Sequence, residues 1–165
     1  MKARDHVILG GVAAAGLFPW FGRHVVIFWL ASVFIDIDHY IDYVYYNGFR
    51  NYSIRNMFKF HDLLTTWWKR PEFLAIQIFH LIEIQLLIGI IGIWLNSQIL
   101  IMIFLGMIFH IILDTIYLYS FRVIYIRVYS LIEYIIRIRN MHRQKLYPRT
   151  MFVEAANNIL CNDTE

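Results

Sequence analysis

The chain has 165 residues, of which 59% are hydrophobic, 18% aromatic and only 16% charged, with a formal net charge of +3. Soluble domains usually carry about 25% charged residues, so this composition excludes an ordinary water-soluble globule and predicts a domain that lies in a lipid bilayer. The single cysteine, Cys161, excludes an internal disulfide framework and a cysteine-based zinc site.

The first two expected elements are apolar spans over residues 7–22 and 24–46. The basic start of the chain resembles a signal peptide. Asp5 and His6 directly precede the apolar stretch, however, and no small-x-small site ends it, so we expect a retained membrane segment. The second span is long enough to cross a hydrocarbon core. Its last third contains four ionisable residues: Asp36, Asp38, His39 and Asp42.

Two further spans, over residues 73–95 and 98–120, each have about the 20 apolar residues that a bilayer crossing requires. No linker interrupts residues 1–120, so they are expected to form one four-span membrane domain. Residues 121–145 predict an amphipathic basic helix, which either lies in the membrane interface or extends the fourth span. Residues 146–165 read as a polar tail without an assigned function. The predicted fold is an all-α integral membrane bundle of about four spans plus a C-terminal amphipathic helix.

The basic residues predict the orientation of this bundle. All of them except Arg23 precede the first span, lie in the 47–72 loop, or follow the fourth span. The positive-inside rule then places both termini and this loop in the cytoplasm, for a multi-pass protein of the cell (inner) membrane. Four basic residues of the loop are expected to bind anionic lipid headgroups: Arg55, Lys59, Lys69 and Arg70. The alternative is a buried helical bundle within a soluble complex, which would leave the one-sided charge unexplained.

Histidines and carboxylates of all four spans are expected at one depth, in the cytoplasmic half of the membrane. His110 and Asp114 lie about 40° apart on a helix, and His80 and Glu83 about 60° apart, so each pair faces one side. Facing histidines and carboxylates on neighbouring helices are typical of metal sites in helical bundles. The candidate metal ligands are His6, Asp36, Asp38, His39, His80, Glu83, His110 and Asp114. The alternatives are a helix-to-helix hydrogen bond for His110–Asp114 and a solvated helix end for Asp36–Asp42.

At these residues the chain resembles the YdjM-type (LexA-regulated) family of predicted membrane-bound metal-dependent hydrolases. His6 matches the early histidine of that family, and Ile35-Asp36-Ile37-Asp38-His39 matches its Pro-Asp-x-Asp-His signature without the proline. The run from His110 to Asp114 matches its late His-x-x-x-Asp motif.

The middle of the chain departs from the family. Its His-Arg-Gly-x-Thr-His-Ser signature is represented only by His80, in Phe79-His80-Leu81-Ile82-Glu83, with His61 standing in for the first histidine. The family is also similar to zinc-dependent phospholipase C, whose sites use His-x-x-x-Asp and His-x-x-x-Glu pairs. His80 and Glu83 are one residue closer together than the second of these pairs.

Two functions are expected from this pattern. The first is a metal-dependent hydrolase that acts on a phosphate ester, most plausibly of a lipid, at the cytoplasmic membrane face. Zinc suits a His/Asp/Glu set without thiolates, manganese or iron would also fit, and eight ligands allow two ions. Glu83 would be the general base, unless it is itself a ligand, and His61 an acid.

The second expected function is a non-catalytic membrane subunit that assembles with a membrane-protein partner and uses metal as a structural clamp. A metal carrier would need polar residues along its path in both halves of the membrane, and the outer halves of the spans have almost none. Nucleic acid is not an expected partner, because phospholipid explains the modest basic loop equally well.

Overall fold

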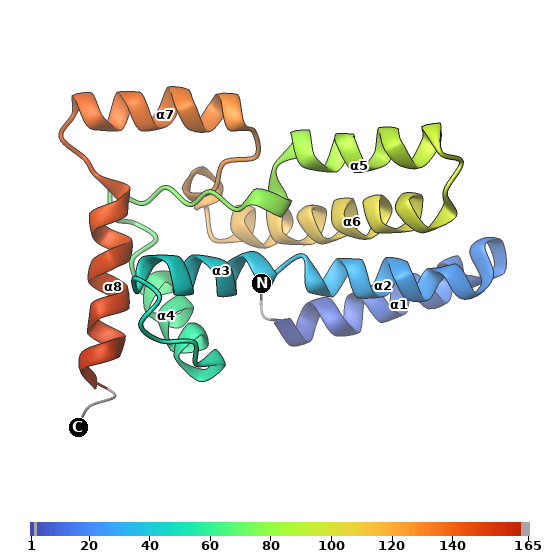
Figure 1. The fold of residues 1–165 in the computed structure, drawn as a ribbon, viewed down its shortest axis with the longest axis horizontal. Coiled ribbons are helices and arrows are strands. Elements are labelled where there is room, and N and C mark those ends of the chain that lie inside the picture. The colour runs from blue at the N-terminus through green and yellow to red at the C-terminus, as the bar shows by residue number, and fades with distance from the viewer. Residues whose placement is uncertain (2, 163–165) are drawn as a thin grey trace. The chain divides into compact units, whose positions relative to one another are not determined.

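The computed structural model describes residue 1 and residues 3–162, and its regular elements are helices throughout (Figure 1). This confirms the predicted all-α class. The chain divides into two compact units. The first unit comprises Met1–Asp36 and Ile78–Ile124, and the second comprises Ile37–Gln77 and Tyr125–Glu165.

The first unit contains four α-helices that run side by side (Figure 1). They are α1 (Ala3–Phe21), α2 (Val25–Phe34), α5 (Ile82–Trp94) and α6 (Gln98–Ser120). Two 3₁₀ turns, η1 (Gly22–His24) and η2 (Ile78–His80), precede α2 and α5. Gly22 has φ +53° at the turn from α1 to α2, a conformation that costs a residue with a Cβ atom free energy. The Ser97 hydroxyl accepts a hydrogen bond from the Leu100 N–H and so caps α6.

Small residues allow α1, α2 and α6 to approach closely. A Cβ atom at Gly106 of α6 would overlap the carbonyl oxygen of Phe28 and lie 3.0 Å from Cβ of Ala31, both on α2. A Cβ atom at Gly10 of α1 would lie 2.5 Å from Oγ of Ser32. Close backbone contact through small residues is typical of helix packing in membranes, where apolar burial supplies little driving force. These contacts fix the α2–α6 register that the candidate site depends on.

Two helical stretches, Arg4–Tyr46 and Gln98–Ser120, are long and apolar enough to cross a membrane. Length and composition alone are weak evidence for membrane association, because core helices and signal sequences can share them. The Arg4–Tyr46 stretch is divided by the turn at Gly22 and by a second break at Asp36. Helix α5 has only 13 residues, fewer than the ~20 that a crossing requires. The structure therefore supports a helical bundle and does not establish four spans.

The first residues of the expected third span lie in the second unit. Ala75 pairs with Ile126 and Val128 through two backbone hydrogen bonds of 2.8 and 3.2 Å, in an isolated parallel bridge. Phe73 and Leu74 are buried. These apolar residues thus pack in a protein core, and the helix after them begins only at Ile82.

The second unit contains α3 (Ile37–Tyr46), α4 (Ile54–Thr66), α7 (Leu131–Arg143) and α8 (Pro148–Asn162). The short turn η3 (Ile124–Ile126) lies where the chain leaves the first unit. Within residues 121–145 the α-helix extends only from Leu131 to Arg143, because part of the segment before it is engaged in the bridge with Ala75.

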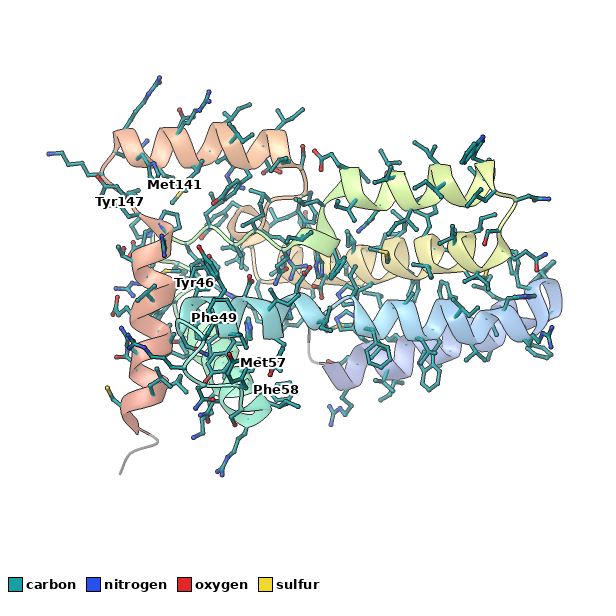
Figure 2. The ribbon with its side chains drawn as sticks, in the orientation of Figure 1. Tyr46, Phe49, Met57, Phe58, Met141 and Tyr147 are labelled. Atoms are coloured by element: carbon teal, nitrogen blue, oxygen red, sulfur yellow. The ribbon has the colours of Figure 1, made fainter. Side chains whose placement is uncertain are left out.

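Helix α8 lies in the expected polar tail. Its buried residues follow helical spacing and form one stripe: Met151, Phe152, Ala155, Ala156 and Ile159. The Phe152 ring stacks on Tyr46 of α3, which is labelled in Figure 2, with ring centroids 4.8 Å apart. Helix α8 therefore completes the core of the second unit.

Candidate metal centre

Four side chains of the first unit converge on one point. Asp36 follows α2, His80 is the last residue of η2, and His110 and Asp114 lie one turn apart on α6. Each offers one ligand atom, and these four atoms all lie within 4.8 Å of one another. His80, His110 and Asp114 are buried, while the Asp36 side chain is 19% exposed. This cluster could hold a metal ion.

The separations between the ligand atoms suit a small divalent ion. Nε2 of His110 lies 3.3 Å from Oδ1 of Asp36 and 3.6 Å from Oδ2 of Asp114. Nε2 of His80 lies 3.9 Å from the same Asp36 oxygen. Tetrahedral ligands at ~2.0–2.1 Å from an ion are about 3.4 Å apart. Small movements of these side chains would complete such a shell.

The charges of the cluster also favour a cation. Asp36 and Asp114 bring two carboxylates to a site where both histidines are fully buried. Burying a charge without compensation costs several kcal/mol, and a divalent ion among the ligands would neutralise both carboxylates. A cation bound here would therefore stabilise both acids among apolar helices, beside the contact of the Met1 α-amino group with Asp114.

The backbone of α2 orients His110 for this role. Nδ1 of His110 lies 2.7 Å from the carbonyl oxygen of Ser32, which can only accept a hydrogen bond. Nδ1 must therefore carry the proton, and Nε2 is the ring atom that would bind an ion. Partners of this kind fix the tautomer and ring orientation of metal-binding histidines. The sequence contains no signal for this contact, because Ser32 contributes a backbone atom.

His6 of α1 supports the centre from outside the group of four. Its ring stacks on the His110 ring at a centroid distance of 3.8 Å, and Nε2 lies 3.1 Å from Oδ1 of Asp114. The same carboxylate oxygen accepts a hydrogen bond from the α-amino group of Met1 at 2.8 Å. His6 Nε2 donates to Asp114, and this contact positions a carboxylate whose other oxygen faces His110. His6 was predicted to be a ligand, and in the structure it contacts two residues of the group of four without belonging to that group.

Gln85 of α5 positions His80. Its side chain is fully buried, and its Nε2 donates a hydrogen bond of 3.1 Å to the carbonyl oxygen of Phe79. Phe79 lies inside η2 and directly precedes His80. This contact ties the 3₁₀ turn to the first turns of α5 and limits the positions that the His80 ring can adopt.

We expect Gln85→Leu to lower the affinity for metal by about tenfold, which is the lower end of what outer partners of metal ligands typically contribute. Titration of the purified protein with Zn²⁺ would measure the change. The matched control is Gln98→Leu, an exposed glutamine at the start of α6. Equal affinities for the two variants would contradict the positioning role of Gln85.

Several sequence-predicted site residues are not in this group. Glu83, the predicted general base, is exposed in the first turn of α5. Asp38, His39 and His61 belong to the second unit. There, Nδ1 of His39 lies 2.8 Å from Nε2 of Gln77, and Nε2 of His61 lies 2.8 Å from the carbonyl oxygen of His39. The two histidines therefore form a network within their own unit.

The remaining acids of the 36–42 cluster have a different positive neighbour. Asp38 is buried in α3, and the charges of Asp38 and Arg127 both act on Asp42. Arg127 is itself buried. The four acidic and histidine side chains thus separate, with Asp36 in the first unit and the others in the second. No pattern in the sequence marks Arg127 as a partner for Asp42.

The predicted headgroup-binding residues all lie in the second unit, where their environments differ. Arg55 and Lys69 are exposed, and Lys59 is half-buried. Arg70 is engaged by Glu72 at 3.2 Å and by Glu154 at 3.3 Å, and its guanidinium lies 4.3 Å from the centre of the Trp67 ring. Arg70 thus joins α8 to the rest of its unit.

No family model, curated protein or solved structure matches the chain. The resemblance to YdjM-type hydrolases therefore stays a prediction from the motifs.

Proposed function

We propose that this chain is a membrane-bound, metal-dependent hydrolase that acts on a phosphate ester of a lipid at the cytoplasmic face of the inner membrane. The convergence of Asp36, His80, His110 and Asp114 on one buried point carries this proposal. A cation held there would lower the pKa of a bound water toward ~7 and stabilise charge on phosphoryl oxygens. The resemblance to YdjM-type hydrolases supports the same reaction class.

The four side chains divide naturally into two roles. His80, His110 and Asp114 are buried and would hold the ion, since catalytic zinc sites typically use three protein ligands and leave one position open. Asp36 is the most exposed of the four, at 19%. We assign it a place beside the open position, where its carboxylate would orient the attacking water and accept its proton. Glu83, exposed and outside the group, is assigned no contact with the ion.

A mixed set of two imidazoles and carboxylates without thiolates favours zinc, with manganese or iron as the other candidates. Two histidine nitrogens point to a borderline ion more than to calcium or magnesium, which prefer oxygen ligands. One ion would use three of the four converging residues as ligands and would have Asp36 as its neighbour.

The exterior of the first unit supports a membrane location. Large apolar side chains cover the outer faces of its helices, and Trp20, Ile93 and Trp94 are 74%, 74% and 81% exposed. Contiguous exposed apolar surface of this kind marks contact with lipid or with another protein. Trp20 and Trp94 lie near the ends of α1 and α5, where interfacial aromatic residues are expected. A lipid substrate would then reach the site without leaving the bilayer.

We expect Asp36→Asn to retain bound metal and fold but to lose at least about a hundredfold in turnover, the usual contribution of a general base. The measurement is phosphate release from phosphatidic acid in mixed micelles, beside the metal content of the same preparation. His142→Ala, an exposed change on α7, is the control for metal content. Turnover at the wild-type rate would refute the assignment of Asp36.

A structural clamp in a non-catalytic assembly subunit is the second candidate. It is favoured by one observation, namely that the four ligands come from three separate elements, the end of α2, the turn η2 and helix α6. Structural zinc sites use four protein ligands and no open position. In that case Asp36→Asn would lose metal and stability together, and the wild-type protein would release no phosphate.

A further inference from the structure

Helix α7 carries apolar side chains on its outer side as well as on its inner side. None of its residues is buried, and no other described helix packs extensively against it. Glu133, Tyr134, Arg137, Ile138 and Met141 are half-buried and define the inner side. The other residues of the helix are exposed, among them Ile132 at 68% and Ile136 at 55%. Figure 2 shows Met141 on the side of α7 that is directed toward α8, while other side chains project from the opposite side of the helix.

Polar contacts hold the inner face. The Arg137 guanidinium donates to the carbonyl oxygen of Arg127 at 3.3 Å, to the carbonyl oxygen of Tyr125, and to Glu133 at 2.9 Å. Glu133 in turn accepts a hydrogen bond from the N–H of Tyr129 at 3.0 Å. The outer side nevertheless exposes four large aliphatic residues: Leu131, Ile132, Ile135 and Ile136. Contiguous exposed apolar surface of this kind marks contact with lipid or with another protein.

The outer face changes character along its length. At about 100° per residue, five exposed residues fall within an arc of about 100°: Ile132, Ile135, Ile136, Arg139 and Arg143. The first three occupy the N-terminal half of the helix, and the two arginines occupy the C-terminal half. Lys145, directly after the helix, is also exposed and basic. Along the helix axis, this one face therefore changes from isoleucine residues to arginine residues.

We propose that α7 is a membrane-docking helix that inserts its isoleucine-bearing half into the acyl-chain region and keeps its arginine-bearing half among anionic headgroups. A uniform apolar stripe would suit a protein groove or a second copy of the chain equally well. The step from apolar to basic along one face matches the order of layers in a phospholipid leaflet, where acyl chains give way to phosphates. The proposal concerns the second unit and is independent of the metal centre.

The depth of individual α7 residues in the bilayer tests the proposed docking. Single-cysteine variants Ile132→Cys, Ile136→Cys, Arg139→Cys and Arg143→Cys would be made in a Cys161→Ser background, spin-labelled, and reconstituted in vesicles of phosphatidylcholine and phosphatidylglycerol. Asn157→Cys on the exposed side of α8 provides a water-facing reference. Collisions with oxygen report the acyl-chain region, and collisions with a water-soluble nickel complex report the aqueous phase. A helical circular dichroism spectrum would show that each variant is folded.

Labels at positions 132 and 136 are expected to collide with oxygen and to be protected from nickel, while labels at 139 and 143 should be shallower. Two results would overturn the proposal. Nickel access at 132 and 136 equal to that at 157 would place α7 in water. Protection of 132 and 136 from both reagents would show that a protein, either a partner or a second copy, covers the face.

The basic half has its own test. With the label at 136, the depth should be greater in vesicles that contain phosphatidylglycerol than in phosphatidylcholine alone. Replacing both Arg139 and Arg143 by Gln should abolish that difference. A depth that is independent of anionic lipid in the parent protein would refute the role of the arginines.

Discussion

Chelation is expected to lower the Tm of the detergent-solubilised protein by roughly 10 °C. An ion present at a thousand times its Kd stabilises the folded state by about 4 kcal/mol, and each kcal/mol corresponds to ~2–4 °C for a chain of this size. Without the ion, the carboxylates of Asp36 and Asp114 remain close together beside buried histidines, with no divalent charge between them. A thermal melt with and without a chelator measures the effect.

Two variants make this result specific. Asp114→Asn removes a buried ligand, so its Tm should no longer respond to chelation. His142→Ala lies on the exposed side of α7 and should respond as the wild-type protein does. Purification without chelators that yields no stoichiometric metal, together with an unchanged Tm, would count against both the hydrolase and the structural clamp.

Gly106→Ala is expected to destabilise the protein by about 3 kcal/mol, at the upper end of what overpacking usually costs, and to release the metal. The added Cβ atom would overlap the carbonyl oxygen of Phe28, a backbone atom that can move only if α2 moves. Separating α2 from α6 would also break the 2.7 Å contact between Ser32 and Nδ1 of His110. Metal content and Tm of the variant should therefore fall together.

The matched control is Gly16→Ala in α1. A Cβ atom there meets no other atom within 4 Å, so alanine should be neutral or stabilise the helix by up to about 1 kcal/mol. If Gly106→Ala behaved like this control, the close α2–α6 contact would not be what holds the site together.

The all-α class, the apolar character of α6 and the pairing of two of its polar residues could be predicted from the sequence. His110 and Asp114 lie four residues apart within one unbroken helix, so local periodicity alone determines that they share a face. Their spacing needs no information from elsewhere in the chain. Both belong to the group of four in the structure.

Periodicity could not predict the rest of the group, because the helices break next to the polar residues. The expected span 24–46 is interrupted at Asp36, which separates that carboxylate from Asp38 and His39 on α3. His80 lies in a 3₁₀ turn before α5, so its expected common face with Glu83 does not exist, and Glu83 is exposed. The angle between two side chains can be predicted from their spacing only within one continuous helix, so it does not apply across such a break.

The sequence by itself determined the all-α class and the apolar character of α1, α2, α5 and α6, since these properties follow from local composition and spacing. Tertiary structure decided where helices stop and which polar groups meet. Phe73 and Leu74 read as part of a membrane span, yet they are buried in the second unit through the bridge at Ala75. The stripe on α8 is buried because Phe152 packs against the Tyr46 and Phe73 rings, which lie far away in the sequence. Each of these outcomes depends on a partner distant in the chain, and the free energy of such a contact is absent from any single segment.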